Sequence, residues 1–353
     1  MDAALKRFRR IFVSREAEDT FHGRTIVLRA AAAGIPVEVL ANDAALANAT
    51  AHSRTGTLVV QSTPAGGWVK RAEHGLLADR IGERYLNPIE GCQSGCTYCY
   101  LRSRPLGLHP IRLNVATDQF FNAITEDLGD GNDARIYCTG ELADSLAEIE
   151  IYPIAALLAR YFNRNGNARL ELRTKSDCVD PLLSIDHGGK TTIAFSIAPQ
   201  ANVEAYEPGT ASLLQRVAAA SRCQAAGYPI ALKFEPIIMT PDWQTAYTDA
   251  LDLICSTVRV AELDHVSIGC LRWSERLAAT PTFAKRHQDA IAAGTWIEYR
   301  PGIFNATVRK DERIEVYDWL RVQMRRRRIS APIWWSLEEA EVIAEMERRD
   351  QAA

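Results

Sequence analysis

The stretch GCQSGCTYCYLR, residues 91–102, places three cysteines within eight positions, at Cys92, Cys96 and Cys99. The other five of the chain's eight cysteines are scattered through apolar stretches, so the cysteines do not form a disulfide framework. Buried structural cysteines rarely crowd together beside glycines such as Gly91 and Gly95. The three cysteines therefore predict a metal centre or a redox site on one loop.

Three kinds of site compete for these thiols. A structural zinc ion takes four ligands, usually in two spaced pairs, and no second CxxC or HxxxH motif follows in the sequence. A redox dithiol needs only two of the three cysteines. A four-iron cluster usually takes four cysteines, and three would leave one iron open for a chelating ligand. Because thiolates suit soft iron, the pattern favours an iron–sulfur cluster over zinc and over a redox pair.

The composition is that of a globular protein, with 353 residues, 47% hydrophobic and 24% charged. This length fits one large barrel-type domain or two smaller domains. The formal net charge of −3 gives no indication of nucleic-acid binding. No apolar run reaches the roughly 18 residues of a membrane helix, and the basic first residues lack the apolar core of a secretory signal. We therefore expect no membrane association and a reducing, cytoplasmic location.

Short apolar strands alternate with helical segments after the cysteine loop. Strands are predicted over residues 134–138, 168–174, 191–197, 228–237 and 264–271. Repeated βα units with nearly continuous apolar strands are typical of a parallel sheet or barrel. The first strand of this series is expected near residues 85–91. The cysteine loop would then lie at the C-terminal end of that strand, where the active sites of barrels are found.

The spacing C-x3-C-x2-C, with Tyr98 directly before the last cysteine, resembles that of the radical SAM superfamily. There the three cysteines hold a [4Fe-4S] cluster, and the open iron binds the amino and carboxylate groups of S-adenosylmethionine (SAM). An electron from the cluster cleaves SAM and yields a 5′-deoxyadenosyl radical. The resemblance implies an α/β fold: a partial (β/α)6 TIM-type barrel over residues 84–290, an N-terminal α/β extension over 1–83, and a C-terminal hairpin and helices over 291–353.

Longer motifs resemble the spore photoproduct lyase family, whose members are radical SAM enzymes that reverse a thymine dimer in DNA. The likeness runs almost from end to end and includes CYLRSRPLG (99–107), RTKSDCVDPLLSIDHGGKTTIAFSI (173–197) and VEAYEPGTASLLQRVAAASRCQAAGYPIALKFEPII (203–238). It implies a carbon–carbon lyase with a [4Fe-4S] cluster and SAM as cofactors. It also implies a DNA lesion or nucleoside-type substrate, and a flavodoxin- or ferredoxin-type electron donor.

Site residues are implied where this sequence matches the family. Cys92, Cys96 and Cys99 would ligate the cluster. Lys175 and Ser196 match positions that hold the SAM carboxylate and ribose, and a cation facing a carboxylate suits that chemistry. Tyr98 matches a tyrosine near SAM. Tyr100 is a further catalytic candidate, with packing in the core as its alternative.

Cys138 matches the family's cysteine at the end of the second barrel strand, which donates a hydrogen atom to the product radical. A buried core cysteine is the alternative interpretation. The segment continues as Thr139-Gly140-Glu141-Leu142-Ala143-Asp144 and departs from the family pattern after the threonine. Gly140-Glu141 resembles the Gly-Glu motif with which other radical SAM enzymes bind the SAM amino group. Asp144 is a candidate for the place of the family's aspartate.

The substrate is less closely indicated than the chemistry. Arg300, in TWIEYRPGIFNATVRK, is the candidate for the exposed arginine of the family's DNA-binding hairpin, and RRRR (325–328) is a candidate phosphate contact. The altered segment after Cys138 and the acidic net charge favour a different substrate. A family relative that acts on a nucleoside, a nucleotide or a natural-product intermediate is therefore the alternative function.

Overall fold

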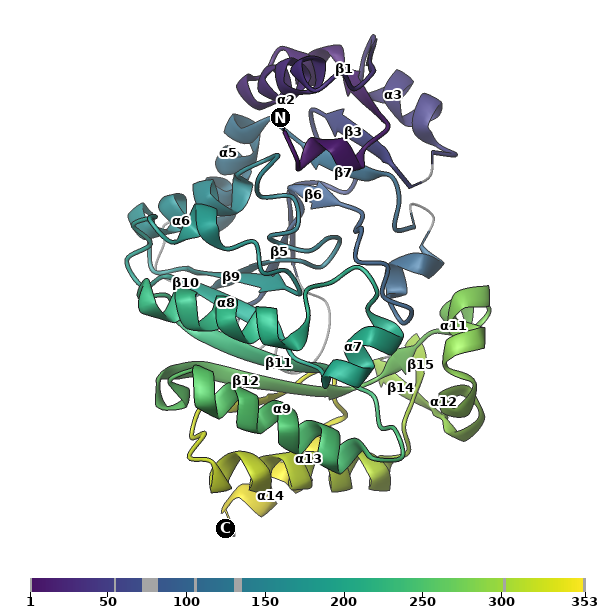
Figure 1. Cartoon of the computed structure of the whole chain (residues 1–353), viewed down its shortest axis with the longest axis vertical. Helices are drawn as coiled ribbons and strands as arrows, with labels where there is room; N and C mark the ends of the chain where they lie inside the picture. The colour runs from purple at the N-terminus through teal and green to yellow at the C-terminus, as the bar shows by residue number, and fades with distance from the viewer. Residues whose placement is uncertain are drawn as a thin grey trace.

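The computed structural model describes residues 2–53, 55–71, 82–104, 107–129, 135–300 and 303–351. Its strands form three sheets of five, eight and three strands. Figure 1 shows the five-stranded sheet at the N-terminal end of the molecule, the eight-stranded sheet in the middle and the C-terminal helices at the opposite end. Within these residues, no helix is both long and apolar enough to cross a membrane.

The eight-stranded sheet contains the predicted βα series. Six parallel strands follow one another in chain order, with β16 added in parallel beside β12 and β4 added antiparallel beside β5. This arrangement confirms the α/β class and the six-stranded parallel series. The strands are β4 (Val69–Arg71), β5 (Arg84–Leu86), β8 (Ile136–Thr139), β9 (Arg169–Thr174), β10 (Thr191–Ser196), β11 (Ile230–Ile237), β12 (Leu263–Cys270) and β16 (Ile333–Trp335).

Helices connect these strands and cover the outer face of the sheet. Helix α6 buries Ile154, Leu158 and Phe162, which recur at a spacing of four residues and so share one face. A capping box between Ser212 and Gln215 fixes the start of α8. The connections are α5 (Thr117–Leu128), α6 (Ile154–Arg164), the 3-10 turn η3 (Asp180–Leu182), α7 (Gln200–Tyr206), α8 (Leu213–Ala225), α9 (Trp243–Thr257) and η4 (Val260–Glu262).

The five-stranded sheet has the order β2-β1-β3-β7-β6. It takes β6 and β7 from beyond residue 83, so the cysteine loop leaves one strand of this sheet and returns into the next. The division of the chain at residue 83 stays a prediction. The elements are η1 (Leu5–Arg7), β1 (Arg10–Ser14), α1 (Arg15–Glu18), α2 (Phe21–Ala32), β2 (Val37–Leu40), α3 (Asp43–Thr50), β3 (Thr57–Gln61), β6 (Ile89–Glu90), η2 (Tyr100–Ser103) and β7 (Ile111–Asn114).

The C-terminal part contains the predicted hairpin and two helices. Strands β14 and β15 pair in antiparallel fashion, and β13 joins them in the three-stranded sheet. Figure 1 shows this sheet beside α11 and α12, while α13 and α14 lie next to α9. The elements are β13 (Arg272–Trp273), α10 (Glu275–Ala278), α11 (Pro281–Arg286), α12 (Gln288–Ala293), β14 (Thr295–Arg300), β15 (Ile303–Thr307), α13 (Lys310–Arg326) and α14 (Ala340–Gln351).

Candidate active site

The cysteine loop is fixed at its start by a glycine that no other residue could replace without strain. Gly91 has a φ of 88°, and a Cβ built on it would lie 2.7 Å from the Pro110 carbonyl oxygen. The Gly91 amide donates to the Leu142 carbonyl at 2.8 Å, and the Cys92 amide donates to the Leu108 carbonyl at 2.9 Å. The positive φ of Gly91 therefore turns the chain at the start of the loop and holds the first cysteine against the neighbouring loops.

The three thiols share one loop, and Cys99 raises the pKa of Cys92 while Cys92 and Cys99 both raise that of Cys96. Burial is the main cause that raises the pKa of Cys92, to about 12, and burial likewise raises those of Cys96 and Cys99. Within the described ranges, no three His, Cys, Asp or Glu side chains converge closely enough to hold a single metal ion. In an iron–sulfur cluster the thiolates ligate separate iron atoms, so three cysteines on one loop suit such a cluster.

A charged cluster lies beside the loop and contains three of the predicted SAM-binding residues. The Lys175 ammonium lies 3.9 Å from Glu207 Oε1 and 5.9 Å from the centre of the Tyr98 ring. The Tyr98 hydroxyl donates to the same carboxylate. The fully buried Arg216 forms an ion pair with Glu207 and donates to the Ser196 carbonyl at 3.0 Å. The structure therefore brings Lys175, Tyr98 and Ser196 together around Glu207.

Asp144 positions the strand end that carries Lys175. Its carboxylate accepts hydrogen bonds from the Thr174 hydroxyl at 2.7 Å and from the Lys175 amide at 2.6 Å. It also accepts from the amides of Leu146 and Ala147. Three of these four hydrogen bonds go to Oδ1 and one goes to Oδ2. Direct SAM binding by Asp144 stays a prediction, and the contacts within the chain give it a positioning role.

Glu141, unlike Asp144, contacts the neighbouring segment of the chain through its backbone. Its backbone carbonyl accepts a hydrogen bond from the Tyr100 hydroxyl at 2.7 Å. Among the described residues, no hydrogen-bond or ion-pair partner contacts the Glu141 carboxylate. Tyr100 is 41% exposed, so it is not a core residue, and Arg104 lies over its ring. Binding of the SAM amino group by Glu141 stays a prediction.

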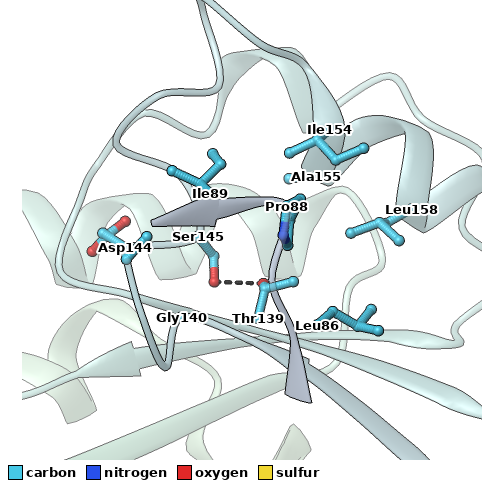
Figure 2. A pocket seen from close by; sticks show the side chains of 11 residues that line it. Leu86, Pro88, Ile89, Thr139, Gly140, Asp144, Ser145, Ile154, Ala155 and Leu158 are labelled. Carbon is cyan, nitrogen blue, oxygen red and sulfur yellow. Dashed lines mark hydrogen bonds between the residues drawn. The ribbon is translucent and has the colours of Figure 1, made fainter. Parts of the chain in front are cut away.

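Behind this segment lies a small pocket. Figure 2 shows Thr139, Gly140, Asp144 and Ser145 along one side, with apolar side chains of β5 and α6, among them Leu158, on the other. The Thr139 and Ser145 hydroxyls are 2.6 Å apart and hydrogen-bonded to each other. This bond ties the end of β8 to the segment that follows it. The pocket therefore separates the site segment from the helix layer.

Cys138 lies at the C-terminal end of β8 and is 1% exposed. Its thiol donates to Glu83 Oε1 with a sulfur-to-oxygen distance of 3.3 Å, and Arg173 Nη2 donates to its sulfur at 3.2 Å. Tyr85, which pairs with Cys138 across β5 and β8, packs against it. The candidate hydrogen donor therefore lies in a polar, enclosed environment.

Further charged residues share the inner face of the sheet with Cys138. Glu171 is opposite Cys138 in the β8–β9 pairing and forms an ion pair with Arg173, and its Oε2 lies 3.4 Å from His265 Nε2. Lys233 lies 3.3 Å from Glu235, which accepts a hydrogen bond from Ser267. Sequence reasoning did not identify this group. Its signal is the alternation of charged and apolar residues in the strand segments LELRT and ALKFEPI.

The structure gives little evidence on the predicted nucleic-acid contacts. Arg300 ends β14, and its side chain lies outside the described part of the structure. Trp296 and Phe304 on the same hairpin are 52% and 55% exposed. In the basic run 325–328, Arg325 pairs with Asp350 and Arg327 with Asp252. Two arginines of the run are thus engaged within the chain.

A parallel six-stranded βα series with a three-cysteine loop beside its strand ends defines the radical SAM class of fold. The family model for spore photoproduct lyase matches residues 79–283, which is more than half of the chain. The chain belongs to the spore photoproduct lyase family.

Curated relatives are similar over about half of their length. The spore photoproduct lyase of Bacillus subtilis is 29% identical over 164 residues, which cover 44% of this chain and 46% of the relative. That of Clostridium acetobutylicum is 27% identical over 164 residues, covering 46% of this chain and 49% of the relative. That of a Geobacillus species is 28% identical over 184 residues, covering 50% and 52%. The chain therefore spans about half the length of the curated relatives it matches.

Solved structures extend the likeness of the fold to nearly the whole chain. A spore photoproduct lyase mutant with bound AdoMet and dinucleoside spore photoproduct matches with a TM-score of 0.79 at 19% identity, over 92% of this chain and 98% of that one. A spore photoproduct lyase complexed with dinucleoside spore photoproduct matches with the same score and identity, over 93% and 99%. These similarities confirm the predicted fold.

Proposed function

We propose that this protein is a radical SAM enzyme of the spore photoproduct lyase type, with a [4Fe-4S] cluster and SAM as cofactors. The observation that carries the proposal is the placement of a buried thiol, Cys138, on the inner face of the same sheet whose strand ends carry Lys175 and Ser196. Membership of the family and the fold of the solved relatives support it.

The residues present fit these cofactors. Cys92, Cys96 and Cys99 would hold the cluster through their sulfur atoms, which suit iron. Lys175 would bind the SAM carboxylate, and the Glu141 carboxylate, which has no ion-pair partner among the described residues, would bind the SAM amino group. When bound, the cluster and SAM supply a 5′-deoxyadenosyl radical. The enclosing strands and the buried ion pairs of the inner face would keep water away from the reaction.

Cys138 would then complete the repair of a thymine dimer. Abstraction of a hydrogen atom from the lesion leads to cleavage of the bond between the two thymines, which leaves a carbon radical on the product. Donation from Cys138 breaks its S–H bond, forms a C–H bond and leaves a sulfur radical on the cysteine. Lesion repair with Cys138 as donor is therefore the proposed reaction, classed as a carbon–carbon lyase.

A second candidate function, radical chemistry on a different substrate, is favoured by a separate observation. The inner face carries charged pairs, Lys233 with Glu235 and Arg173 with Glu171. Together with the Glu141 carboxylate, these groups suit a polar nucleoside, nucleotide or natural-product substrate as well as a DNA lesion. The radical chemistry would be the same and the substrate different.

One anaerobic assay separates these functions. Reconstituted protein is reduced and incubated with SAM and dinucleoside spore photoproduct, and the products are identified by mass spectrometry. Repair predicts the release of thymidylyl-thymidine. Formation of 5′-deoxyadenosine without thymidylyl-thymidine would remove the repair reaction and leave the alternative substrate class. The absence of both products from cluster-loaded protein would remove the enzyme proposal.

The proposal also includes a cellular setting. An acidic one-electron carrier of the flavodoxin or ferredoxin type would reduce the cluster, and the free cysteines fit a reducing cytoplasm. Candidate contacts with a DNA lesion are Arg300 and the exposed aromatic rings of the hairpin. An electron-transfer assay with reduced flavodoxin, followed through 5′-deoxyadenosine formation, tests the carrier.

A further inference from the structure

Two oppositely charged side chains contact the sulfur of Cys138. Arg173 Nη2 donates to the sulfur at 3.2 Å, and the thiol donates to Glu83 Oε1 at 3.3 Å. Arg173 and Glu83 are themselves joined by an ion pair. Glu83 is 7% exposed and precedes β5, and no motif in the sequence marks it. The thiol, the carboxylate and the guanidinium thus form a closed triangle on the inner face of the sheet.

The protonation state of Cys138 decides what it can do. Only the thiol carries a hydrogen atom to donate, whereas an arginine beside a cysteine stabilises the thiolate. Arg173 therefore works against burial and lowers the pKa of Cys138, toward the form that cannot act as a donor. The carboxylate of Glu83 supplies a compensating anion and also accepts the S–H bond, which only the thiol form can offer.

The charged groups that most affect the pKa of Cys138 divide between Arg173, which lowers it, and two carboxylates, which raise it. Burial is the largest cause of the raised pKa of Cys138. Arg173 lowers that pKa, while Glu171 and Glu83 raise it. Tyr85 packs against the sulfur from β5, and its own raised pKa, caused mainly by burial, keeps it neutral. Glu171 is shared with Lys233 and His265, so Glu83 is the carboxylate that faces the thiol directly.

We propose that Glu83 is a positioning residue that keeps Cys138 in its hydrogen-donating thiol form, by balancing Arg173 and by accepting the S–H bond. The catalytic meaning of this role rests on the function proposed above. The structural claim, a thiol held protonated by Glu83 against Arg173, stands independently of activity. It also explains why a buried arginine is tolerated beside a residue that must stay protonated.

The direct test is a titration of the Cys138 thiol in the cluster-loaded protein. Thiolate formation is followed by its ultraviolet absorbance, as the difference between each protein and the same protein carrying Cys138→Ala. In Glu83→Gln the thiolate fraction at a given pH is expected to rise at least tenfold, which corresponds to one pKa unit. In Arg173→Met the titration is expected to move the opposite way. A titration of either variant that superimposes on the parent would overturn the proposal.

A matched control removes a different buried glutamate. Glu148 is 2% exposed and pairs with Arg7, but it makes no contact with Cys138. Glu148→Gln should leave the Cys138 titration unchanged, whatever it does to stability. An equal shift in Glu148→Gln would show a general electrostatic effect and would contradict a specific role of Glu83. If Glu83→Gln does not fold, Arg173→Met decides, because an unchanged titration in that variant is sufficient to reject the triangle.

Activity provides a second readout that a merely structural role would not move. Product formation by Glu83→Gln should be restored toward the parent level at low pH and should fall as pH rises through the new Cys138 pKa. A loss of activity that is equal at every pH would indicate a folding defect and would contradict the proposal. If the parent protein cleaves no SAM, the proposed function fails while the thiol titration still tests Glu83.

Discussion

Replacement of Lys175 by methionine tests the SAM-binding part of the site most sharply. The variant removes the ammonium but keeps an unbranched apolar stem, and the Lys175 amide can still donate to Asp144. The two oxygens of Glu207 already accept hydrogen bonds from Tyr98 and Arg216. At 3.9 Å, the Lys175 ammonium is therefore only loosely paired and keeps donors for a ligand carboxylate.

The expected magnitude follows from these contacts. A hydrogen bond between charged groups contributes about 1.5–3 kcal/mol. Because every 1.4 kcal/mol is about a tenfold change in affinity, Lys175→Met should weaken SAM binding by roughly 10- to 150-fold. Glu207 keeps Arg216 as its buried counter-charge, so the variant should still fold and still bind the cluster.

Calorimetric titration of SAM into anaerobically reconstituted protein measures this change. Lys190→Met is the matched control, because Lys190 donates to the Asn163 and Gly166 carbonyls just before β10 begins, at the end of that strand away from Ser196. The control should bind SAM like the parent. A dissociation constant for Lys175→Met within twofold of the parent, at equal iron content, would refute the assignment of Lys175 to SAM.

Three further predictions concern the loop and the interior. Gly91→Ala forces a side chain against the Pro110 carbonyl at a positive φ, so it should cost about 1–3 kcal/mol in unfolding free energy and lower the iron content per chain. His287 donates to or accepts from Thr97 at 2.9 Å, and burial, aided by Arg286, lowers its pKa to about 4. Because the unfolded chain binds this proton more tightly, stability should fall between about pH 6.5 and 4, and His287→Phe should lose that dependence and about 1 kcal/mol at neutral pH. Burial would raise the pKa of Glu171, but its cationic neighbours outweigh burial and hold it at about 2, so its contribution of about 3 kcal/mol should be lost as pH falls from about 4.5 to 2.

Denaturant unfolding as a function of pH, combined with iron analysis, checks all three. A full iron content in Gly91→Ala would contradict the role of the turn. An unchanged slope of stability against pH in His287→Phe would contradict a buried neutral imidazole. In Glu171→Gln the unfolding free energy should depend less on pH below about 4.5. A dependence like that of the parent would show that other carboxylates are responsible.

The cysteine loop and the strand series could be predicted from the sequence because their signals are local. Three thiols within eight positions need no knowledge of the fold. The apolar strand segments lie within a few residues of their observed bounds. The meeting of Lys175, Ser196 and Tyr98 was predictable only through family resemblance, since they come from three separate segments of the chain.

The charged groups around Cys138 could not be predicted, because their contacts depend on which strands become neighbours. Glu83 reaches Cys138 since β5 pairs with β8, although 55 positions separate the two residues. Glu171 and Arg173 alternate with leucines in β9, and that period marks two different faces. The prediction of nearly continuous apolar strands did not include this alternation. Charged residues on this inner face take counter-charges from their own strand, as Arg173 does from Glu171, and from other segments, as Arg173 does from Glu83.

The electron paramagnetic resonance spectrum of the anaerobically reconstituted and reduced protein, recorded with and without SAM, tests the central claim most directly. We predict the signal of a reduced four-iron cluster, a change of that signal on addition of SAM, and loss of the signal in Cys96→Ala. A protein that binds no iron, or a cluster signal that SAM leaves unaltered, would contradict the account.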